Sequence, residues 1–324
     1  MFWSSNGRQQ SEVASIRPDG AGRRTIRDLP YSGRFLLSPD ASSIALTIYN
    51  SRSDDADVWL MKPDGTQYRN LTGTPKRDEY IYDWSPGSRR IAFERLDASG
   101  TQIYLLNVRS GKERRVVAGY RPSLSPDGGH IAYAAPSPDV ADFTTDIFTM
   151  DLTTGEVTRL TEDSSSDDDH PEWSPAGGWL GFNRIPTGQM NEYEGPYSDI
   201  WRVRTSGEDE QNLTNYQDDY NGVSTAEWSP DGAWIAYNTD FDEGGAVYVM
   251  RSDGSDRSKP LSDPVGSWSR NPTWSPRGNH LAYERSGKQS TDIWTYDLAS
   301  GSKKRITSTV KRYESLPFWA SCQE

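Results

Sequence analysis

The chain has 324 residues and carries 35 basic against 47 acidic side chains, a net charge of −12. This sign does not suit a surface that condenses on phosphates, so we exclude nucleic acid as a partner. The single cysteine, Cys322, excludes an internal disulfide and a cysteine zinc site. No apolar run approaches the about 20 residues that cross a bilayer, so we expect no membrane insertion.

The first 27 residues read as three short strands that lack a strand before them. Phe2-Trp3 would lie in the first, residues 12–16 in the second, and Asp19-Gly20 would form the turn before the third. The missing strand is a feature to look for elsewhere in the chain.

A turn motif recurs through the rest of the chain. In its fullest form, Trp228-Ser229-Pro230-Asp231-Gly232, Pro fixes φ at about −65° and Gly accepts a positive φ, so one strand ends and another begins. The serines of the six copies are Ser38, Ser85, Ser125, Ser174, Ser229 and Ser275, which are 47, 40, 49, 55 and 46 residues apart. Periods of this size are typical of propeller blades.

Each copy continues with three further strands. An apolar strand such as Ile235-Ala236-Tyr237 follows the turn, and then a strand with a fixed aromatic residue, such as Asp292-Ile293-Trp294. A turn with Gly leads to a fourth strand that ends in a pair such as Leu160-Thr161. Four antiparallel strands in each of six complete repeats, about residues 33–314, predict propeller blades.

The C-terminal segment supplies the missing strand. Residues 315–320 match the stretch that ends at Trp274-Ser275, with Trp319 placed 45 residues after Trp274. We predict an all-β, seven-bladed propeller of four-stranded antiparallel blades, in one domain over residues 1–324. Its composite blade combines residues 1–30 and 315–324, and pairing of residues 315–320 with the strands of residues 1–27 closes the ring.

These repeats resemble the TolB-type (WD40-like) β-propeller family, whose consensus includes Trp-Ser-Pro-Asp-Gly, Ile-Ala-Phe, Asp-Ile-Trp and Arg-x-Leu-Thr. The resemblance covers nearly the whole chain and implies the fold rather than an activity. Related repeats occur in prolyl-oligopeptidase-like proteases and in oligogalacturonate lyases. The usual location of this family implies a bacterial protein in the periplasm or outside the cell. The N-terminal residues Met1-Phe2-Trp3, however, do not begin a signal peptide. A cytoplasmic location is the alternative.

One face of the predicted ring should carry the long connections between strands, and binding residues concentrate on such loops. The connections are Tyr49–Ala56, Gly73–Tyr82, Ala134–Thr144, Glu162–Pro171, Asn183–Ser198, Asn215–Ala226, Asn238–Gly245 and Ser262–Pro272. The candidate ligand-binding residues are Asp168, Asp169, His170, Tyr193, Tyr197, Asp219, Tyr220, Asp240, Asp242 and Trp268. Their acidic and aromatic character suits a protein or carbohydrate ligand. The alternative is that acidic loops only keep the ring soluble.

His170 and Trp268 are weighed individually. His130 and His280 occupy a variable slot just before the second strand, so we interpret both as structural. His170 follows three aspartates immediately before an inner strand, near the predicted channel mouth, where it could act as a base or a metal ligand. Trp268 falls outside the repeat pattern on the variable face. Eight other tryptophans occupy repeat positions expected in blade cores: Trp59, Trp84, Trp173, Trp201, Trp228, Trp274, Trp294 and Trp319.

Catalytic motifs are scarce. The chain has no Gly-x-Ser-x-Gly elbow, and the acidic string of residues 163–169 lacks EF-hand spacing. The related lyases use manganese with several His ligands, whereas only His170 is suitably placed here. We therefore expect no catalytic residues and no cofactor, although loops that converge in space could bind calcium or another divalent ion.

The sequence favours a monomeric, non-enzymatic binding module. A metal-dependent carbohydrate lyase or hydrolase at the channel mouth is one alternative. A propeller subunit or fragment of a larger assembly is another.

Overall fold

The computed structural model describes most of the chain. The described residues are 1–6, 11–30, 32–50, 55–138, 144–187, 198–216, 222–240, 245–261, 267–287, 290–308 and 313–320. Within these ranges every regular element is a β-strand, which confirms the predicted all-β class. The same ranges hold no helix long and apolar enough to span a membrane.

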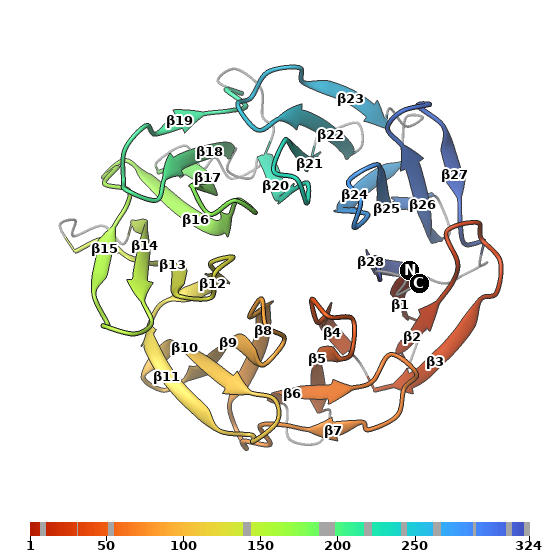
Figure 1. The fold of residues 1–324 in the computed structure, drawn as a ribbon, viewed down its shortest axis with the longest axis horizontal. Helices are drawn as coiled ribbons and strands as arrows, with labels where there is room; N and C mark the ends of the chain where they lie inside the picture. Colours follow the sequence, from red (N-terminus) through yellow and green to blue (C-terminus); the bar gives the residue numbers. More distant parts are fainter. Residues whose placement is uncertain are drawn as a thin grey trace.

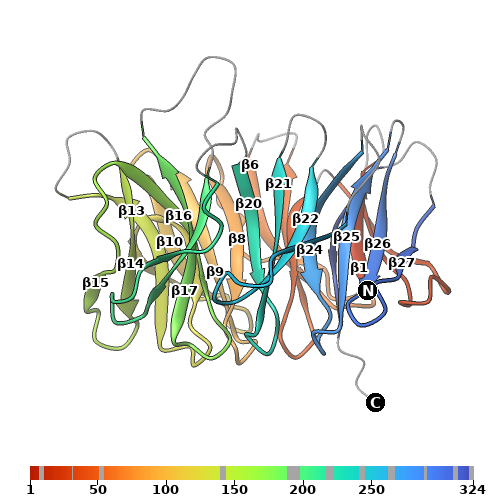
Figure 2. The same ribbon diagram turned by 90° about the horizontal axis from the view of Figure 1, so that it is seen from above.

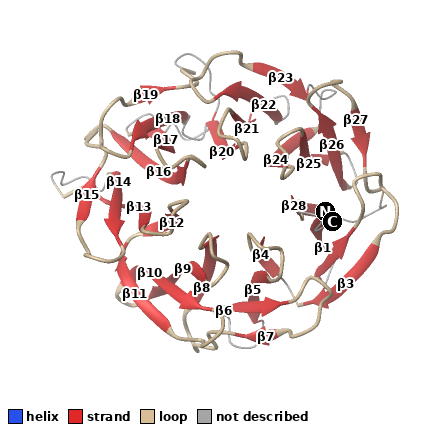
Figure 3. Ribbon diagram, viewed as in Figure 1, coloured by secondary structure: helices blue, strands red, loops and turns tan. Residues whose placement is uncertain are grey.

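The strands form four-stranded antiparallel units around a central axis (Figures 1 and 3). The first strands, nearest the axis, are β4 (Ser32–Leu37), β8 (Asp78–Trp84), β12 (Tyr120–Leu124), β16 (Ser166–Trp173), β20 (Gly222–Trp228), β24 (Trp268–Trp274) and β28 (Tyr313–Phe318). The second strands are β5 (Ile44–Asn50), β9 (Arg90–Asp97), β13 (His130–Pro136), β17 (Trp179–Pro186), β21 (Trp234–Asp240), β25 (His280–Ser286) and β1 (Phe2–Asn6).

The remaining strands lie farther from the axis. The third strands are β6 (Asp55–Met61), β10 (Gly100–Asn107), β14 (Thr145–Asp151), β18 (Asp199–Arg204), β22 (Ala246–Arg251), β26 (Thr291–Asp297) and β2 (Ser11–Ser15). The fourth strands are β7 (Arg69–Asn70), β11 (Glu113–Ala118), β15 (Val157–Arg159), β19 (Gln211–Asn212), β23 (Ser258–Leu261), β27 (Lys303–Arg305) and β3 (Arg24–Leu29). Single parallel bridges also join β6 to β8 and β26 to β28.

The Ser-Pro turns lie on one face of the ring, here called the turn face (Figure 2). In the first turn, Ser38 Oγ donates a hydrogen bond to Asp40 Oδ1 at 2.6 Å and accepts one from the Ser43 amide at 3.0 Å. The residue after this aspartate has a left-handed backbone, with φ of 69° at Gly232 and 55° at Ala41. Serine, aspartate and glycine therefore have separate roles in the turn.

The Asp-Ile-Trp and Leu-Thr motifs join the third and fourth strands. Thr161 Oγ1 accepts a hydrogen bond from the Ile147 amide at 3.0 Å, and Arg159 Nη2 lies 2.8 Å from Asp146 Oδ2. Equivalent hydroxyl contacts cap Val58, Ile200 and Ile293. These contacts explain why an aspartate and a threonine recur in a largely apolar pattern, because each pairs with a backbone amide or a side chain of the adjacent strand.

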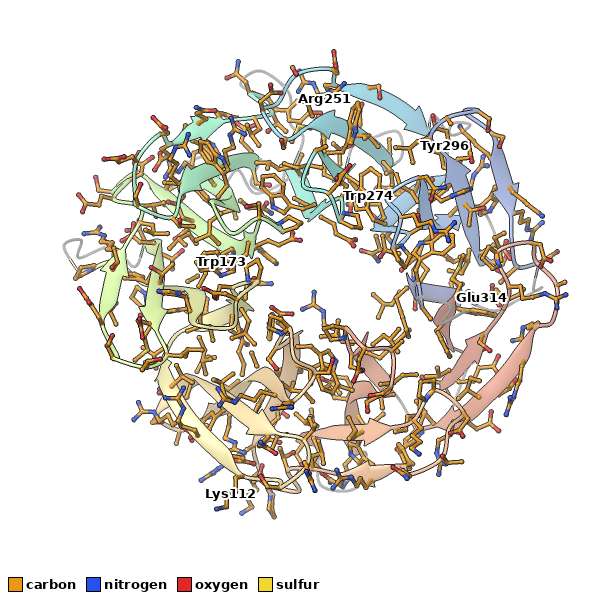
Figure 4. All side chains as sticks on the ribbon, in the orientation of Figure 1. Lys112, Trp173, Arg251, Trp274, Tyr296 and Glu314 are labelled. Atoms are coloured by element: carbon orange, nitrogen blue, oxygen red, sulfur yellow. The ribbon has the colours of Figure 1, made fainter. Side chains whose placement is uncertain are left out.

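The inner tryptophans tie each unit to the one before it. Trp274 Nε1 donates to the Glu227 carbonyl at 3.0 Å, and Trp173 Nε1 donates to the Ser123 carbonyl at 3.1 Å. Both indoles lie at the inner side of the ring (Figure 4). Buried or partly buried, all eight predicted core tryptophans contact or belong to the apolar clusters between units.

The ring closes as predicted, through pairing of the C-terminal strand with the N-terminal ones. β28 pairs antiparallel with β1, and Phe2 lies opposite Phe318. Their rings stack with centroids 5.2 Å apart, and Phe35 of the next unit meets Phe318 at 4.8 Å. Trp319 Nε1 donates to the Thr273 carbonyl at 3.2 Å, repeating the contact made by Trp274.

Candidate binding site at the centre of the ring

Several predicted contact residues lie outside the described residues. They are Tyr193, Tyr197, Asp219, Tyr220 and Asp242. Asp240 is the last residue of β21, and only its backbone is described. The remaining candidates are Asp168, Asp169, His170 and Trp268, whose positions the structure gives.

The prediction that residues 162–171 form a loop is wrong for its second half. Asp168, Asp169 and His170 belong to the inner strand β16, where Asp168 pairs with Arg184 and Asp169 with Asn183 of β17. A run of aspartates reads as a solvated loop, but here neighbouring cations compensate the charge. The same correction applies to Trp268, which was expected in the loop 262–272 and is the first residue of β24.

Asp168 lies in the interior of its unit. Its side chain is fully buried, and Arg184 holds both carboxylate oxygens at 2.7 Å. The Arg184 guanidinium also contacts Glu210 Oε1 at 2.5 Å and lies 4.4 Å from the centroid of the Trp201 ring. The Asp168 carboxylate is thus committed to a buried ion pair, and it does not face a ligand.

Asp169 instead faces the axis together with residues of the neighbouring unit. Its Oδ2 lies 2.9 Å from Arg121 Nε and 3.3 Å from His170 Nδ1. Arg121 Nη1 also meets His170 Nε2. Since guanidinium can only donate, Nε2 must accept this hydrogen bond, which assigns the proton of a neutral His170 to Nδ1. Although burial opposes it, the His170 and Arg121 contacts hold the pKa of Asp169 below its usual range.

This trio keeps contact with solvent. The side chains are 46% exposed for His170, 37% for Arg121 and 18% for Asp169. All three belong to β12 and β16, strands that border the centre of the ring (Figure 1), so we infer that their exposed atoms border the axis. We therefore regard Arg121, Asp169 and His170 as the centre of the candidate site and call them the axial trio.

Two further residues support the trio from the preceding unit. The Arg121 amide donates to the carboxylate of Glu94 on β9. Burial raises the pKa of Glu94, and burial also raises the pKa of the nearby Tyr82 hydroxyl to about 12. Tyr82 lies beside a second cation, because the Arg34 guanidinium is 5.1 Å from its ring centroid. Four consecutive inner strands thus present Arg34, Tyr82, Arg121 and His170.

A second level of the ring centre carries carboxylates. Asp83, Glu172 and Glu227 each precede the last residue of an inner strand, closer to the turn face than the trio. Asp83 Oδ2 accepts the Leu124 amide of the next unit at 2.7 Å, and Glu227 Oε1 accepts the Trp274 amide at 3.4 Å. Burial raises the pKa of Asp83 to about 6 and that of Glu227 to about 7.

A β-bulge positions the trio's side chains. Register shifts interrupt β12 between Tyr120 and Ser123, and β16 between Asp169 and Glu172. Four residues at the bulge slot have positive φ, between 50° and 54°, and each directly precedes a proline: Arg121, His170, Asn271 and Leu316. The extra residue bends the inner strand and redirects its side chain.

Trp268 begins β24, an inner strand other than β12 and β16, which carry the trio, and its environment is different. Its side chain is 41% exposed, and a Cβ added to Gly245 would lie 2.9 Å from the indole, so the ring packs closely on the Gly245 backbone. Nearby, Arg270 Nε and Asn271 Nδ2 contact Glu284 at 3.0 and 2.7 Å. Trp268 therefore packs against the neighbouring connection and still keeps an exposed surface.

A family model described as the TolB beta propeller domain matches residues 22–191. The chain belongs to the TolB beta-propeller family. The uncharacterized protein Atu1656 of Agrobacterium fabrum is 30% identical over 262 residues, which cover 72% of this chain and 82% of that protein. The uncharacterized peptidase YuxL of Bacillus subtilis is 28% identical over 200 residues, 60% of this chain but only 26% of the peptidase.

Solved structures share this TolB-family fold at low identity. TolB from Acinetobacter baumannii superposes with a TM-score of 0.60 at 16% identity, covering 94% of this chain and 79% of that one. An oligogalacturonate lyase in complex with manganese gives a TM-score of 0.66 at 13% identity, covering 94% and 83%. These likenesses show the fold alone.

Metal-binding potential was tested on the described part of this TolB-family chain. Among those residues no group of three or more His, Cys, Asp or Glu side chains could hold a metal ion. His130 and His280 begin β13 and β25, and their imidazoles lie 3.8 and 3.0 Å from Asp151 and Asp297. These two histidines occupy strand starts, in agreement with the structural interpretation.

The sequence reasoning missed most of the ring centre. It singled out Asp169 and His170 but gave no role to Arg34, Tyr82, Glu94, Asp83, Glu172 or Glu227. Two signals could have found them. Charged residues lie immediately before the inner tryptophan in three repeats, and a proline two residues before the tryptophan, or before the leucine that replaces it, marks the bulge.

Proposed function

We propose that this protein is a non-enzymatic binding module that recognises a protein partner at the centre of the ring. One observation carries the proposal: Arg121, Asp169 and His170 come from two neighbouring units, contact one another and remain exposed around the axis. In this exposure the trio differs from the fully buried carboxylate of Asp168, which is committed to Arg184. Rigid strands position the trio without the cost of ordering a loop, which favours recognition.

Membership in the TolB family supports an interaction role, while the relatives keep other roles open. A carbohydrate ligand is the alternative within the same proposal. An enzyme, a lyase or hydrolase of carbohydrate that uses His170, is the second candidate, and its supporting observation is the hydrogen-bonded Asp169 and His170 pair. A third possibility is a propeller subunit of a larger assembly, since the chain spans about a quarter of the peptidase YuxL.

The proposal also covers the cellular location, the oligomeric state and the cofactor. We place the protein in the periplasm or outside the cell, as a monomer, and assign it no cofactor. A divalent ion would need ligands from outside the described residues, because those described hold no ready group of three.

A capture experiment with matched variants tests the proposal. Immobilised wild-type protein, Asp169→Lys and the control Asp256→Lys would be incubated with extracts of a bacterium that carries the gene and with a glycan array. Asp256 is an exposed acid on the outside of the ring, 3.1 Å from Arg251, so its reversal leaves the centre intact. We expect the affinity of Asp169→Lys for its partners to fall at least about 10-fold, equivalent to 1.4 kcal/mol of binding free energy. The control should bind the same partners as wild-type protein.

The opposite result would overturn the proposal. If Asp169→Lys, shown to be folded by circular dichroism, captured the same partners with the same affinity as the control, the trio would not be the contact site. Turnover of polysaccharides by wild-type protein that disappears in His170→Ala would favour the enzyme instead.

A further inference from the structure

The ring centre separates charge along the axis. The level of the trio carries the guanidinium groups of Arg34 and Arg121, while the level nearer the turn face carries the carboxyl groups of Asp83, Glu172 and Glu227. The two levels lie two residues apart on the inner strands, about 7 Å along an extended chain. Arg34 is exposed and Arg121 is partly exposed, so both cations of this level reach solvent.

Both guanidinium groups converge on Tyr82. Arg34 lies 5.1 Å from the centroid of the Tyr82 ring, and the positive charges of Arg34 and Arg121 both act on its hydroxyl. The two arginines belong to β4 and β12, and Tyr82 belongs to β8 between them. The three side chains therefore approach one another from three consecutive units.

The arginines retain unused donors. Arg121 gives Nε to Asp169 and Nη1 to His170, which fixes the plane of its guanidinium and leaves Nη2 without an acceptor among the described residues. Arg34 forms no ion pair within 4.0 Å with any acid in the described ranges, although Asp83 and Glu172 attract it from a greater distance. A guanidinium held in one plane is well suited to bind two oxygens of a carboxylate or phosphate.

We propose that Arg34 and Arg121, on the strands either side of β8 and Tyr82, form a binding site for an oxyanion of the ligand, a carboxylate or phosphate group. The Arg34 and Arg121 guanidiniums supply the charge and the donors, while the Tyr82 hydroxyl donates to the Glu94 carboxylate and its ring packs against Arg34. This inference rests on the proposed function, because it names the chemical group that a partner would present to the ring centre.

The carboxyl groups of the lower level have raised pKa values. Burial raises the pKa of Glu172 well above its usual range, with Glu227 and Asp83 adding repulsion, whereas burial raises the pKa of Asp83 only to about 6, so Asp83 is mostly ionised at pH 7 and balances part of the arginine charge. The nearer acids, Asp169 and Glu94, already accept hydrogen bonds from Arg121. The free donors at the level of the trio are therefore the remaining N–H groups of Arg34 and Arg121.

Calorimetric titration with two simple anions tests the site. Sodium phosphate and sodium acetate would each be titrated into wild-type protein, Arg34→Gln, Arg121→Gln and the control Arg251→Gln, in chloride buffers of matched ionic strength at pH 7. Arg251 is an exposed arginine on the outer part of the ring that pairs with Asp256. We expect saturable 1:1 binding to wild-type protein and to the control, weakened about 10-fold or more in either centre variant, which corresponds to 1.4 kcal/mol.

The two anions separate the two sources of an oxyanion. Tighter binding of phosphate would point to a phosphorylated ligand, and tighter binding of acetate to a carboxylate such as a peptide terminus or an acidic sugar. No saturable heat with either anion at tens of millimolar, or equal affinity in Arg34→Gln and the control, would overturn the inference. If Arg121→Gln failed to fold, Arg34→Gln and its conservative partner Arg34→Lys would decide the question.

The failures of the two proposals are distinguishable. Absent anion binding together with partner capture that depends on Asp169 would reject only the oxyanion site. Intact anion binding with capture insensitive to Asp169→Lys would reject the partner site and keep the anion site.

Discussion

Asp168 and Asp169 are adjacent in the sequence and have opposite environments. Asp168 points into its unit and pairs with Arg184, whereas Asp169 faces the axis and contacts Arg121 and His170. Residue type alone cannot distinguish the two aspartates, because the register of the strand decides which of two adjacent side chains is buried. The candidate list therefore contained one structural and one exposed carboxylate.

This contrast predicts different effects on stability. Asp168→Ala would leave the Arg184 guanidinium, 7% exposed, without its bidentate partner, and we expect a loss of about 3–5 kcal/mol in the free energy of unfolding. Asp169→Ala should cost less than about 1 kcal/mol, since its partners reach water. Urea unfolding followed by tryptophan fluorescence measures both. Equal losses in the two variants would contradict the assignment.

The left-handed residue of the Ser-Pro turn gives a second prediction at this scale. Ala41 has a φ of 55°, whereas four other turns place glycine in the same slot and one places Ser88. Ala41→Gly relieves about 1–2 kcal/mol of backbone strain and costs about 0.5–1 kcal/mol in chain entropy, so a net gain of up to about 1 kcal/mol is expected. The matched reverse change is Gly232→Ala, where a Cβ would meet Pro175 at an ordinary 3.6 Å, so backbone strain alone should destabilise it. Thermal unfolding of both variants checks the signs.

At the scale of the strand, the inner strands join one unit to the next through acids as well as tryptophans. Glu227 accepts both the Trp274 amide and the Thr273 hydroxyl, the latter at 3.2 Å. These contacts occur beside the axis, where the carboxyl group is only partly exposed. The inner strands therefore hold groups that prefer to be neutral.

The titration of Glu227 predicts a pH dependence of stability. Burial raises its folded-state pKa from an ordinary 4.5 to about 7, so the protonated form is favoured in the folded protein. Its contribution is fully present below about pH 4.5 and is lost as the pH rises through about 7. Glu227→Gln, which stays neutral, should gain about 1–3 kcal/mol relative to wild type on going from pH 5 to pH 8.

Thermal unfolding of both proteins across this range measures the effect. The comparison with wild type cancels the opposite trend of turn aspartates such as Asp231, whose pKa is lowered by its hydrogen bond from Ser229. A stability difference that does not change between pH 5 and pH 8 would contradict the prediction.

Most strands were predictable because their determinants are local. The Ser-Pro turn, the aromatic third strand and the Leu-Thr ending each depend on residues close together in the sequence. The structure places strands on both sides of the turn and at the aromatic residue, but the fourth strand ends just before the pair in four repeats, as β15 does before Leu160-Thr161. The starts of the inner strands were not predictable. Residues 166–171 look polar and contain a proline, and only pairing with β17 makes them a strand.

The ring centre was even harder to predict from the sequence, because it combines residues from several repeats. Arg34, Tyr82 and Arg121 lie far apart in the sequence, and no single repeat contains a recognisable motif for a site. Comparison of equivalent positions between repeats would have shown that the charged residues cluster at two levels. The geometry that brings the guanidiniums together depends on the bulge and on the curvature of the ring.

For the whole molecule, closure is the feature that the repeats predicted and the structure confirms. β28 pairs with β1, and Phe318 packs between Phe2 and Phe35. Phe318→Ala should therefore cost about 2–3 kcal/mol, near the lower end for a large aromatic because the ring is only partly buried. Tyr313→Ala, on the same strand and 59% exposed, should change stability by less than about 0.5 kcal/mol.

Deletion of β28 extends the same test. Removing residues 313–324 exposes the edge of β1, and we expect broad, less cooperative unfolding and faster proteolysis than in either point variant. Cooperative unfolding unchanged from wild type would show that closure contributes little.

A further prediction for the whole molecule is that its thermal stability does not depend on a metal ion. Since the described residues offer no three-ligand group, we expect the same melting temperature with EDTA, calcium or manganese. A site occupied at a hundredfold excess over its dissociation constant would add about 2.7 kcal/mol, which is easily measured. A stoichiometric ion with such a shift would contradict the expectation and point to ligands in the segments 217–221 and 241–244.

The pairing of Phe2 with Phe318 also has a consequence for biogenesis. The strand that completes the composite unit is synthesised after all the other described strands of the ring, when the strands it must join have left the ribosome. Until then β1 presents an open edge, and the contact that covers it spans almost the whole chain, which makes closure a late and slow step. A nascent chain of this kind depends on prompt synthesis of β28 or on a chaperone, and translation stalled before β28 should yield aggregates rather than a closed ring.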